Sequence, residues 1–415
     1  MKTFALVTFG CRVNQADSLA IEAGLIARGA APVPADRADL VVVNTCSVTA
    51  SADQGARQTI RRIHRDNPGA RIVTTGCYAT RAPEQLALLP GVAAVLNNAD
   101  KGNADSGTVP LLEALEKRGL APSSSAGDGP CGRAIEPGTM GRTAWTLRVQ
   151  TGCEERCSYC IIPSTRGASR SRTPDDVLAE VRRIEDAGYR EVAITGVHLG
   201  SYGRDVSPAT SLEALLTRLV RETSSMLFRV SSLEPMDCPT GLIDLACAHP
   251  TRIAPHFHLP LQHASNAVLA RMRRPYTLEQ YSALVDDLRA RLPHAAIGSD
   301  VIVGFPGETD AEFDALASYL ERAPLTHLHV FPYSDRPGTV AEGLPDKVHG
   351  ATVKARAQRI RVISRRLQDR FRASLVGTTR PALAIEDGGV AVTDNYIRVP
   401  LPPGHERNDR VVVVL

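Results

Sequence analysis

A short loop carries the strongest chemical signal in the sequence. Cys153, Cys157 and Cys160 follow the spacing CxxxCxxC. Three thiolates so placed could hold three corners of a cubane iron–sulfur cluster, although such clusters usually take four cysteines. The fourth iron would then stay open for a substrate or cofactor, much as a catalytic zinc keeps an open position. These three residues are named the loop trio.

Two other interpretations of the loop trio stay open. The cysteines could belong to a zinc site, or they could be buried thiols at chance spacing. Zinc sites usually pair one CxxC with a second CxxC or with histidines, and neither follows nearby in the sequence. The spacing therefore favours the iron–sulfur cluster.

Three further cysteines each follow a predicted strand. Apolar runs that read as buried strands occupy residues 3–9, 39–44 and 70–75. Helical stretches at about 18–28 and 53–66 come between them, and this alternation predicts a parallel α/β sheet. Ligands gather at the carboxyl ends of such strands, where Cys11, Cys46 and Cys77 stand. This N-terminal trio would form a second cluster site, unless it is a set of buried thiols in an apolar sheet.

Length and composition narrow the class of protein. A chain of 415 residues is long enough for two or three domains with a sizeable core. The net charge is only +3, so a nucleic-acid site would have to be local. Nine cysteines are an odd number, which argues against a complete disulfide framework and favours a reduced, cytoplasmic protein. No apolar run approaches the ~20 residues that span a membrane, so no membrane partner is expected.

A second alternation of strands and helices starts near Trp145 and positions the loop trio. Six strands are predicted, at residues 147–150, 191–195, 228–232, 256–259, 296–303 and 326–330. Six βα units fall short of the eight that close a triose-isomerase-type barrel. Polar residues and glycines again follow the strand ends, namely Gly196, Glu234, Gln262 and Gly304.

The chain after the barrel is basic and then rich in strands. Between residues 353 and 373, eight lysines and arginines accompany the single acid Asp369, and apolar residues recur at helical spacing. This amphipathic helix could present a solvated charged face while it packs, or it could contact RNA phosphates. Four short strand-like runs after residue 374 predict a small β-barrel. A flexible linker at 118–142, with the isolated Cys131, precedes the six strands.

These motifs resemble a known family of enzymes. A CxxxCxxC loop with an aromatic residue before its last cysteine, here Tyr159, is similar to that of the radical S-adenosylmethionine (SAM) superfamily. The segments around the N-terminal trio resemble the methylthiotransferases of that superfamily: Gly10-Cys11-Arg-Val-Asn14, Asn44-Thr45-Cys46 and Gly76-Cys77-Tyr-Ala79. The motifs Cys11-Arg-Val-Asn14, Gly76-Cys-Tyr-Ala79 and Thr195-Gly-Val-His-Leu-Gly-Ser-Tyr-Gly203 look most like the MtaB-like subgroup, whereas the MiaB-like subgroup usually has methionine–asparagine in place of Val13-Asn14. Asp394-Asn-Tyr-Ile-Arg398 resembles a TRAM domain, an RNA-binding module.

The resemblance implies a fold, cofactors and ligands. The fold would be α/β: an N-terminal parallel α/β cluster domain, a partial (βα)6 radical SAM barrel, and a small C-terminal TRAM-like β-barrel. The expected bounds are 1–117, linker 118–142, 143–350, basic helix 351–373 and 374–415. Two 4Fe-4S clusters are implied, one on each trio, with SAM at the loop trio. The residues that would contact SAM are Tyr159, Gly196, Glu234, Gln262, Ile302 and Gly304.

The resemblance also implies an activity. SAM cleaved at the loop trio would yield a radical that removes hydrogen from carbon 2 of adenine, where a methylthio group is inserted. The substrate would be tRNA that carries N6-threonylcarbamoyladenosine next to the anticodon. Electrons would come from a donor such as flavodoxin or ferredoxin, and sulfur from an unknown donor. The alternatives are action on isopentenyladenosine tRNA or on a ribosomal protein aspartate, and a non-enzymatic iron–sulfur RNA-binding protein that does not consume SAM.

Overall fold

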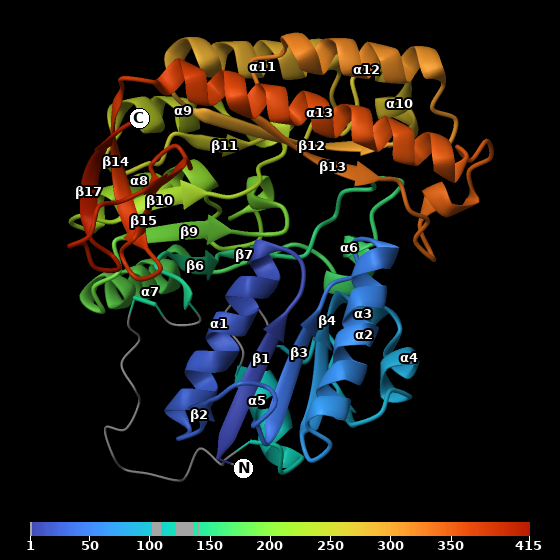
Figure 1. The fold of residues 1–415 in the computed structure, drawn as a ribbon, viewed down its shortest axis with the longest axis vertical. Coiled ribbons are helices and arrows are strands. Elements are labelled where there is room, and N and C mark those ends of the chain that lie inside the picture. Colours follow the sequence, from blue (N-terminus) through green and yellow to red (C-terminus); the bar gives the residue numbers. More distant parts are fainter. Residues whose placement is uncertain (1, 102–108, 122–136, 139–140) are drawn as a thin grey trace.

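The structure is a computed structural model, and it describes residues 2–101, 109–121, 137–138 and 141–415. Most of the predicted linker, with Cys131, therefore lies outside the described residues. The chain forms an N-terminal layer, a curved set of six strands wrapped by helices, a long helix, and a C-terminal sheet (Figure 1).

The N-terminal layer, which comprises β1–β5 and α1–α5, is built on a parallel sheet of order β2-β1-β3-β4-β5. Its strands are β1 (Thr3–Thr8), β2 (Ala31–Pro32), β3 (Leu40–Thr45), β4 (Arg71–Gly76) and β5 (Val92–Val95). Its helices are α1 (Arg12–Ala27), α2 (Ala50–Asp66), α3 (Cys77–Arg81), α4 (Pro83–Ala87) and α5 (Val109–Lys117). Side chains of β3 alternate between two apolar cores, with Val42 toward α1 and α5 and Val41 toward α2. The predicted parallel α/β sheet is confirmed.

Helix α1 begins at Arg12, whereas the sequence predicted a helix from about residue 18. The first turns of α1 are polar in sequence but buried in the structure, with Asn14 and Asp17 at 0% and 1% exposure. Asn14 donates from Nδ2 to the backbone oxygens of Phe9 and Thr45, each over 2.9 Å. An apolar pattern is hard to recognise in this segment, because its buried face mixes Val13 and Ala16 with buried polar groups such as Asn14 and Asp17.

The predicted partial (βα)6 barrel is confirmed. Its parallel strands are β6 (Trp145–Arg148), β9 (Glu191–Thr195), β10 (Leu227–Val230), β11 (His256–His258), β12 (Ala296–Val303) and β13 (His327–Pro332). A parallel bridge between Ser232 and His258 joins the two three-stranded halves. The helices around the strands are α7 (Pro174–Asp186), α8 (Leu212–Glu222), α9 (Thr240–Ala248), α10 (Asn266–Arg271), α11 (Leu278–Arg291) and α12 (Asp310–Arg322). Short elements β7 (Gln150–Thr151), α6 (Ile162–Arg166) and β8 (Arg170–Ser171) flank the loop trio.

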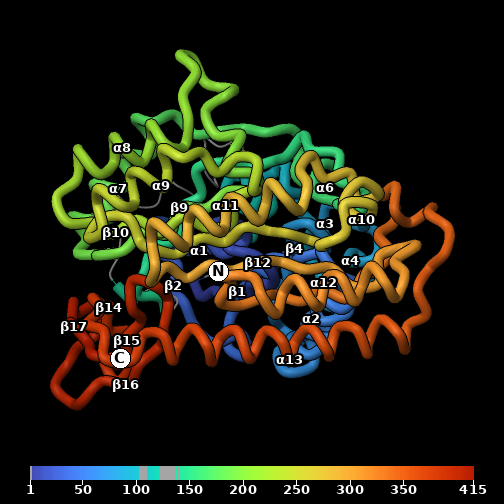
Figure 2. The backbone as a smooth tube through the Cα atoms, turned by 90° about the horizontal axis from the view of Figure 1, so that it is seen from above, coloured from blue at the N-terminus to red at the C-terminus, as the bar shows by residue number. Residues whose placement is uncertain are grey.

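The basic segment forms helix α13 (Gly350–Leu375), which runs along the barrel to the C-terminal sheet (Figure 2). Its buried face includes Ile360, Ile363 and Leu367. Some basic residues are paired, as Arg356 is with Glu308 over 2.6 Å, but Arg361, Arg365 and Arg372 are exposed without ion pairs among the described residues. The C-terminal strands β14 (Thr379–Ile385), β15 (Val390–Thr393), β16 (Arg398–Pro400) and β17 (Arg410–Val414) form one antiparallel sheet, which confirms a small β domain. In the described part of the chain, no helix has the length and apolar character that crossing a membrane requires.

One buried carboxylate joins the N-terminal layer to the barrel. Oδ2 of Asp17 lies 3.0 Å from Nζ of Lys101 and 3.2 Å from Nη2 of Arg166. Its Oδ1 lies 3.3 Å from Nε of Arg148, in β6. Burial alone would raise the pKa of Asp17, but the charges of Lys101, Arg148 and Arg166 outweigh it and hold the pKa well below its usual range. Asp17 is therefore ionised, and it ties α1 to β6 and α6.

Replacing Asp17 with asparagine should strongly destabilise the contact between the layer and the barrel. Loss of one partner from a buried ion cluster costs roughly 3–5 kcal/mol, because the remaining charges stay buried. Urea unfolding can be followed by fluorescence of Trp145, the single tryptophan, which lies in β6. Asp66→Asn is the control, since the Arg65–Asp66 pair is exposed and contributes at most about 1 kcal/mol.

The same carboxylate predicts a pH dependence. Because the pKa of Asp17 is lower in the folded protein, its contribution is complete above the unfolded-state pKa of about 3.9 and is lost as the pH falls below it. The difference in stability between wild type and Asp17→Asn should therefore be constant from pH 5 to neutrality and shrink in more acid solution. A difference that stayed constant down to pH 3 would contradict the assignment.

Candidate active site

The N-terminal trio is brought together at one edge of the sheet. Cys11 precedes α1, Cys46 follows β3, and Cys77 opens α3; Cys11 is exposed and the other two are buried. A Cβ on Gly10, where φ is +87°, would lie 2.5 Å from Sγ of Cys46, so only glycine lets these two loops approach. Burial mainly raises the pKa of Cys46, to about 12, and the neighbouring thiols of Cys11 and Cys77 add to the effect. The sequence placed this trio correctly.

The loop trio is also gathered, on the segment between β7 and α6. All three thiols are free and half-buried, and the backbone N–H of Cys160 donates to the carbonyl of Cys157 over 3.1 Å in a tight turn. Burial mainly raises the pKa of Cys160, to about 12, with further contributions from Cys157 and Cys153. Each trio is therefore a set of free thiols carried by neighbouring loops.

Cationic groups that the sequence did not reveal lie beside both trios. Arg274 donates from Nη1 to Sγ of Cys157 over 3.0 Å and forms an ion pair with Glu234. The guanidinium of Arg166 contacts the thiol of Cys77, and the imidazole of His198 contacts that of Cys153. Although burial opposes it, Asp237 at 2.6 Å and Cys153 raise the pKa of His198 to about 10. Because metals bind the thiolate, these positive charges favour the ligand form of the cysteines.

The geometry of the thiols fits a multi-iron cluster better than a single ion. Across the described residues, one group of three His, Cys, Asp or Glu ligand atoms lies mutually within 4.8 Å, and it is His258, Asp300 and His329. Tetrahedral zinc would hold its sulfur ligands about 3.8 Å apart. In neither trio do all three sulfur atoms lie within 4.8 Å of one another. A cubane does not require this, because it binds each thiolate at a different corner. The residues present thus fit two iron–sulfur clusters.

A pocket of about 150 Å³ lies between the loop trio, whose Cys160 lines it, and the segment that follows Cys46 of the N-terminal trio. The N-terminal layer contributes the residues after Cys46, and the barrel contributes the loop trio and strand ends: Val48, Thr49, Tyr159, Cys160, Ile161, Ile162, Gln262, Asp300, Ile302, Phe331, Pro332, Tyr333, Ser334 and Arg336. Four expected site residues therefore share one pocket, namely Tyr159, Cys160, Gln262 and Ile302. Gln262 has a φ of +65°, a strained conformation for a residue other than glycine, and such strain often marks ligand sites.

Three other expected SAM contacts lie outside the lining of this pocket. Glu234 forms an ion pair with Arg274, which in turn contacts Cys157 of the loop trio. A Cβ on Gly196 would lie 2.8 Å from Leu199 and 2.9 Å from Gln150, so this glycine allows close internal packing. Gly304, with φ at +77°, would meet Val353 of α13 at 2.4 Å. The roles of these three residues in binding SAM stay predictions.

One lining residue of the pocket, Asp300, belongs to a hydrogen-bonded polar cluster on strands β11, β12 and β13. Asp300 accepts from Nε2 of His258 over 2.9 Å and from Nδ1 of His329 over 3.2 Å. Burial raises the pKa of Asp300, but these two hydrogen bonds hold it well below its usual range. His327 lies next to them, and burial with the adjacent histidines lowers its pKa to about 4. Asp300 thus presents a fixed negative charge to the pocket.

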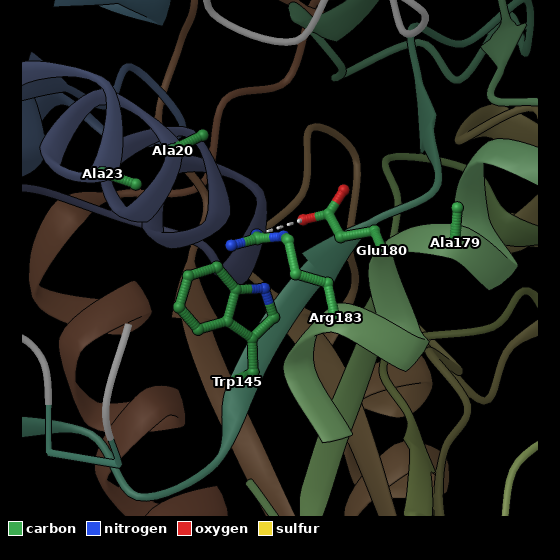
Figure 3. Close-up of a pocket in the computed structure, with 6 residues that line it drawn as sticks. All are labelled: Ala20, Ala23, Trp145, Ala179, Glu180 and Arg183. Carbon is green, nitrogen blue, oxygen red and sulfur yellow. Dashed lines mark ion pairs between the residues drawn. The ribbon is translucent and has the colours of Figure 1, made fainter. Parts of the chain in front are cut away.

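A second hollow, of about 400 Å³, lies between α1 and α7 (Figure 3). Its lining consists of Ala20, Ala23, Trp145, Ala179, Glu180 and Arg183, and Figure 3 shows the arginine paired with the glutamate above the tryptophan ring. These residues offer no thiol or imidazole to a reaction. The chemistry is therefore assigned to the pocket between the trios.

Comparisons with known proteins agree with this arrangement. Residues 3–97 match the uncharacterized protein family UPF0004, and residues 147–320 match the radical SAM superfamily. The solved structure of TsrM from Kitasatospora setae, a radical S-adenosylmethionine methyltransferase, superposes with a TM-score of 0.56 at 17% identity, over 82% of this chain and 77% of TsrM. The barrel is thus that of a radical SAM enzyme.

Relatives that align with nearly the whole chain define its family more narrowly. The threonylcarbamoyladenosine tRNA methylthiotransferase MtaB of Bacillus subtilis is 34% identical over 100% of this chain and 93% of its own length. The ribosomal protein uS12 methylthiotransferase RimO of Saccharopolyspora erythraea is 34% identical over 94% of this chain and 85% of its own length. The chain therefore belongs to the methylthiotransferase family of radical SAM enzymes, whose cofactors are SAM and 4Fe-4S clusters.

The separation of the two trios predicts a simple iron stoichiometry. Anaerobically reconstituted wild type should hold about eight irons per chain, two cubanes of four, and Cys46→Ala or Cys157→Ala should each hold about four. Cys247→Ala is the matched control, because this exposed thiol belongs to neither trio. Iron and acid-labile sulfide assays give the counts. If both trio variants lost all their iron, the two sites would not be independent.

Proposed function

We propose that the chain inserts a methylthio group at carbon 2 of N6-threonylcarbamoyladenosine, next to the anticodon of tRNA. The observation that carries the proposal is a single pocket lined by Cys160 of the loop trio and by Val48 and Thr49, which follow Cys46 of the N-terminal trio; each trio also lies beside a positive charge. The MtaB relative, which aligns with the whole chain, supplies the choice of substrate.

The two trios have different roles in this proposal. The loop trio holds the cluster that binds SAM, and Tyr159, Gln262 and Ile302 form the wall for its adenosyl part, as supported by the pocket they share. The N-terminal trio holds the auxiliary cluster, with Cys11 as its exposed member on the substrate side. When bound, the clusters and SAM supply the radical and the methylthio group that replaces hydrogen on an aryl carbon.

The protein's own residues position and shield this chemistry. The positive charges of Arg274 and His198 attract the thiolates of the loop trio at Cys157 and Cys153. The guanidinium of Arg166 attracts the thiolate of Cys77 in the same way. Because Arg166 also contacts Asp17, the ion cluster that joins layer and barrel also fixes the spacing of the trios. Apolar side chains of Ile161, Ile302 and Phe331 exclude water from the pocket, which protects a reactive radical.

Features of the surface support an RNA substrate. The exposed face of α13 carries unpaired arginines, and Lys347, Lys354 and Arg361 line a hollow of about 490 Å³. That hollow shares Pro332 and Tyr333 with the pocket between the trios, so a phosphate-binding path leads toward the reactive site. The target base would enter out of its stack, as in other base-modifying enzymes.

The remaining parts of the proposal concern partners and organisation. A donor such as flavodoxin or ferredoxin would deliver electrons to the clusters. Residues 1–117 would form the auxiliary-cluster domain, 143–350 the radical SAM core and 374–415 the RNA-binding tail. A protein substrate is the second candidate, because one relative of the chain is a ribosomal protein uS12 methylthiotransferase.

Substitutions in the two trios should separate SAM cleavage from methylthiolation. Cys157→Ala should abolish formation of 5′-deoxyadenosine and of the methylthio product together, because the SAM-binding cluster is lost. Cys46→Ala should keep uncoupled SAM cleavage but yield no methylthio nucleoside. Both products are measured by mass spectrometry of reactions with purified tRNA.

The substrate is tested with nucleosides from cells that lack the gene. Loss of 2-methylthio-N6-threonylcarbamoyladenosine, restored by wild type and not by Cys46→Ala, is the expected result. An unchanged tRNA profile, with a methylthio group missing from a ribosomal protein, would contradict the proposed substrate and favour the second candidate.

A further inference from the structure

Two histidines and an aspartate lie together on one face of the barrel sheet, outside both cysteine trios. Oδ1 of Asp300 lies 2.9 Å from Nε2 of His258 and 3.2 Å from Nδ1 of His329. The three potential ligand atoms all lie within 4.8 Å of one another. These three residues are named the histidine–aspartate site.

Three neighbouring strands hold these side chains in place. They come from β11, β12 and β13, which lie side by side in one parallel sheet (Figure 1). Asp300 is directly opposite His329 in the register of β12 and β13. Gly298 lies two residues before Asp300, therefore on the same face, and it is opposite His258. Because strands hold side chains more precisely than loops do, the spacing of the three ligand atoms is set by the sheet itself.

Glycine at position 298 leaves room for the imidazoles. It lies inside β12, where the extended backbone would accept a larger residue. A Cβ at this position would lie 2.9 Å from Nδ1 of His258 and 2.3 Å from Nε2 of His327. The histidines, and not the backbone, therefore require a glycine here. His327 adds no positive charge to the face at neutral pH, because burial and the neighbouring histidines lower its pKa to about 4.

The spacing and chemistry of the histidine–aspartate site suit a small divalent metal ion. Zinc binds imidazole nitrogen and carboxylate oxygen over about 2.0–2.2 Å, which places tetrahedral ligands roughly 3.4 Å apart. The measured separations of 2.9 and 3.2 Å need only a small outward movement to match this. Asp300 supplies negative charge, since hydrogen bonds from both histidines outweigh burial and hold its pKa well below its usual range. Two histidines and one carboxylate also form the ligand set of catalytic zinc sites that keep an open position.

The histidine–aspartate site is open on one side and adjoins the pocket. The exposed fraction of the side chain rises from 10% at His258 to 24% at Asp300 and 59% at His329, so an ion can enter. Asp300 itself lines the pocket. Ile302 and Phe331 line it as well, and they lie two residues further along β12 and β13 than Asp300 and His329. An ion bound here would therefore lie at the pocket wall.

We infer that His258, Asp300 and His329 bind one divalent transition-metal ion, a third metal centre separate from the two iron–sulfur clusters. Coordination positions that the protein leaves open would bind water or an oxygen atom of the substrate in the pocket. The inference does not depend on which substrate is methylthiolated, because none of the three ligands belongs to a cysteine trio. The alternative is a hydrogen-bonded set of side chains that binds no ion.

The test uses zinc as the probe, because added iron could not be distinguished from the iron of the clusters. Reconstituted wild type with both clusters filled is dialysed against zinc, and the bound metal is counted by inductively coupled plasma mass spectrometry. About one zinc per chain is expected. Its X-ray absorption spectrum should show nitrogen and oxygen neighbours at about 2.0–2.2 Å and no sulfur at about 2.3 Å.

Substitutions identify the ligands. His329→Gln and His258→Gln should each raise the Kd for zinc at least roughly a hundredfold, because losing even an outer-shell partner of a metal can cost that much. His329→Gln is the milder change to the fold, since this side chain is mostly exposed. His249→Gln is the matched control: it replaces an exposed histidine at the end of α9 and should bind zinc as wild type does. The iron and sulfide contents of all three variants should equal those of wild type.

Three results would overturn the inference. The first is a wild type with filled clusters that binds no zinc, and this result needs no variant that folds. The second is zinc with sulfur neighbours, which would place the ion at a cysteine trio. The third is zinc binding that survives both glutamine substitutions. None of these results bears on the methylthiolation of tRNA, which the nucleoside analysis tests separately.

Discussion

The ionised carboxylate of Asp17 is the contact on which the relation between the two cysteine trios depends. It is buried among three cations, one from the N-terminal layer and two from the barrel. One of these, Arg166, also reaches Cys77 and follows the loop trio by only a few residues. A single ion cluster thus couples the edge of the N-terminal sheet to the loop beside it. Without that charge three buried cations would remain unpaired at a junction where Leu19 of α1 also packs into the apolar core of the barrel.

Positively charged side chains near the cysteines also favour metal binding by the thiolates. Burial raises the pKa of Cys46 and Cys160 to about 12, which alone would favour the protonated thiol. The guanidinium of Arg166 opposes this effect of burial at Cys46, and that of Arg274 opposes it at Cys157, while the imidazole of His198 contacts the thiol of Cys153. A cluster adds positive iron at the same places, so the buried thiolates become stable only when metal and arginines act together. The three cations are therefore part of the cluster sites although they hold no iron.

The strands and both cysteine trios could be predicted from the sequence, because apolar runs mark the strands and the carboxyl ends of parallel strands meet at one edge of the sheet. It was insufficient for Asp17, Arg166 and Arg274, because a buried ion pair looks like surface charge in a sequence. Their contacts join residues 149 and 117 positions apart. Gly304 illustrates another limit: a glycine can admit a ligand or a neighbouring helix, and here Val353 of α13 occupies the space. The start of α1 was missed for the related reason that its buried face mixes polar with apolar residues.

The central claim is that the two trios hold clusters that face each other across one pocket. It is tested most directly by electron paramagnetic resonance of the fully reduced, reconstituted protein. Two clusters in neighbouring sites should interact magnetically, so the wild-type spectrum should be broadened relative to the sum of the spectra of Cys46→Ala and Cys157→Ala. A wild-type spectrum equal to that sum, with both clusters fully reduced, would show that the clusters lie far apart and would contradict the account.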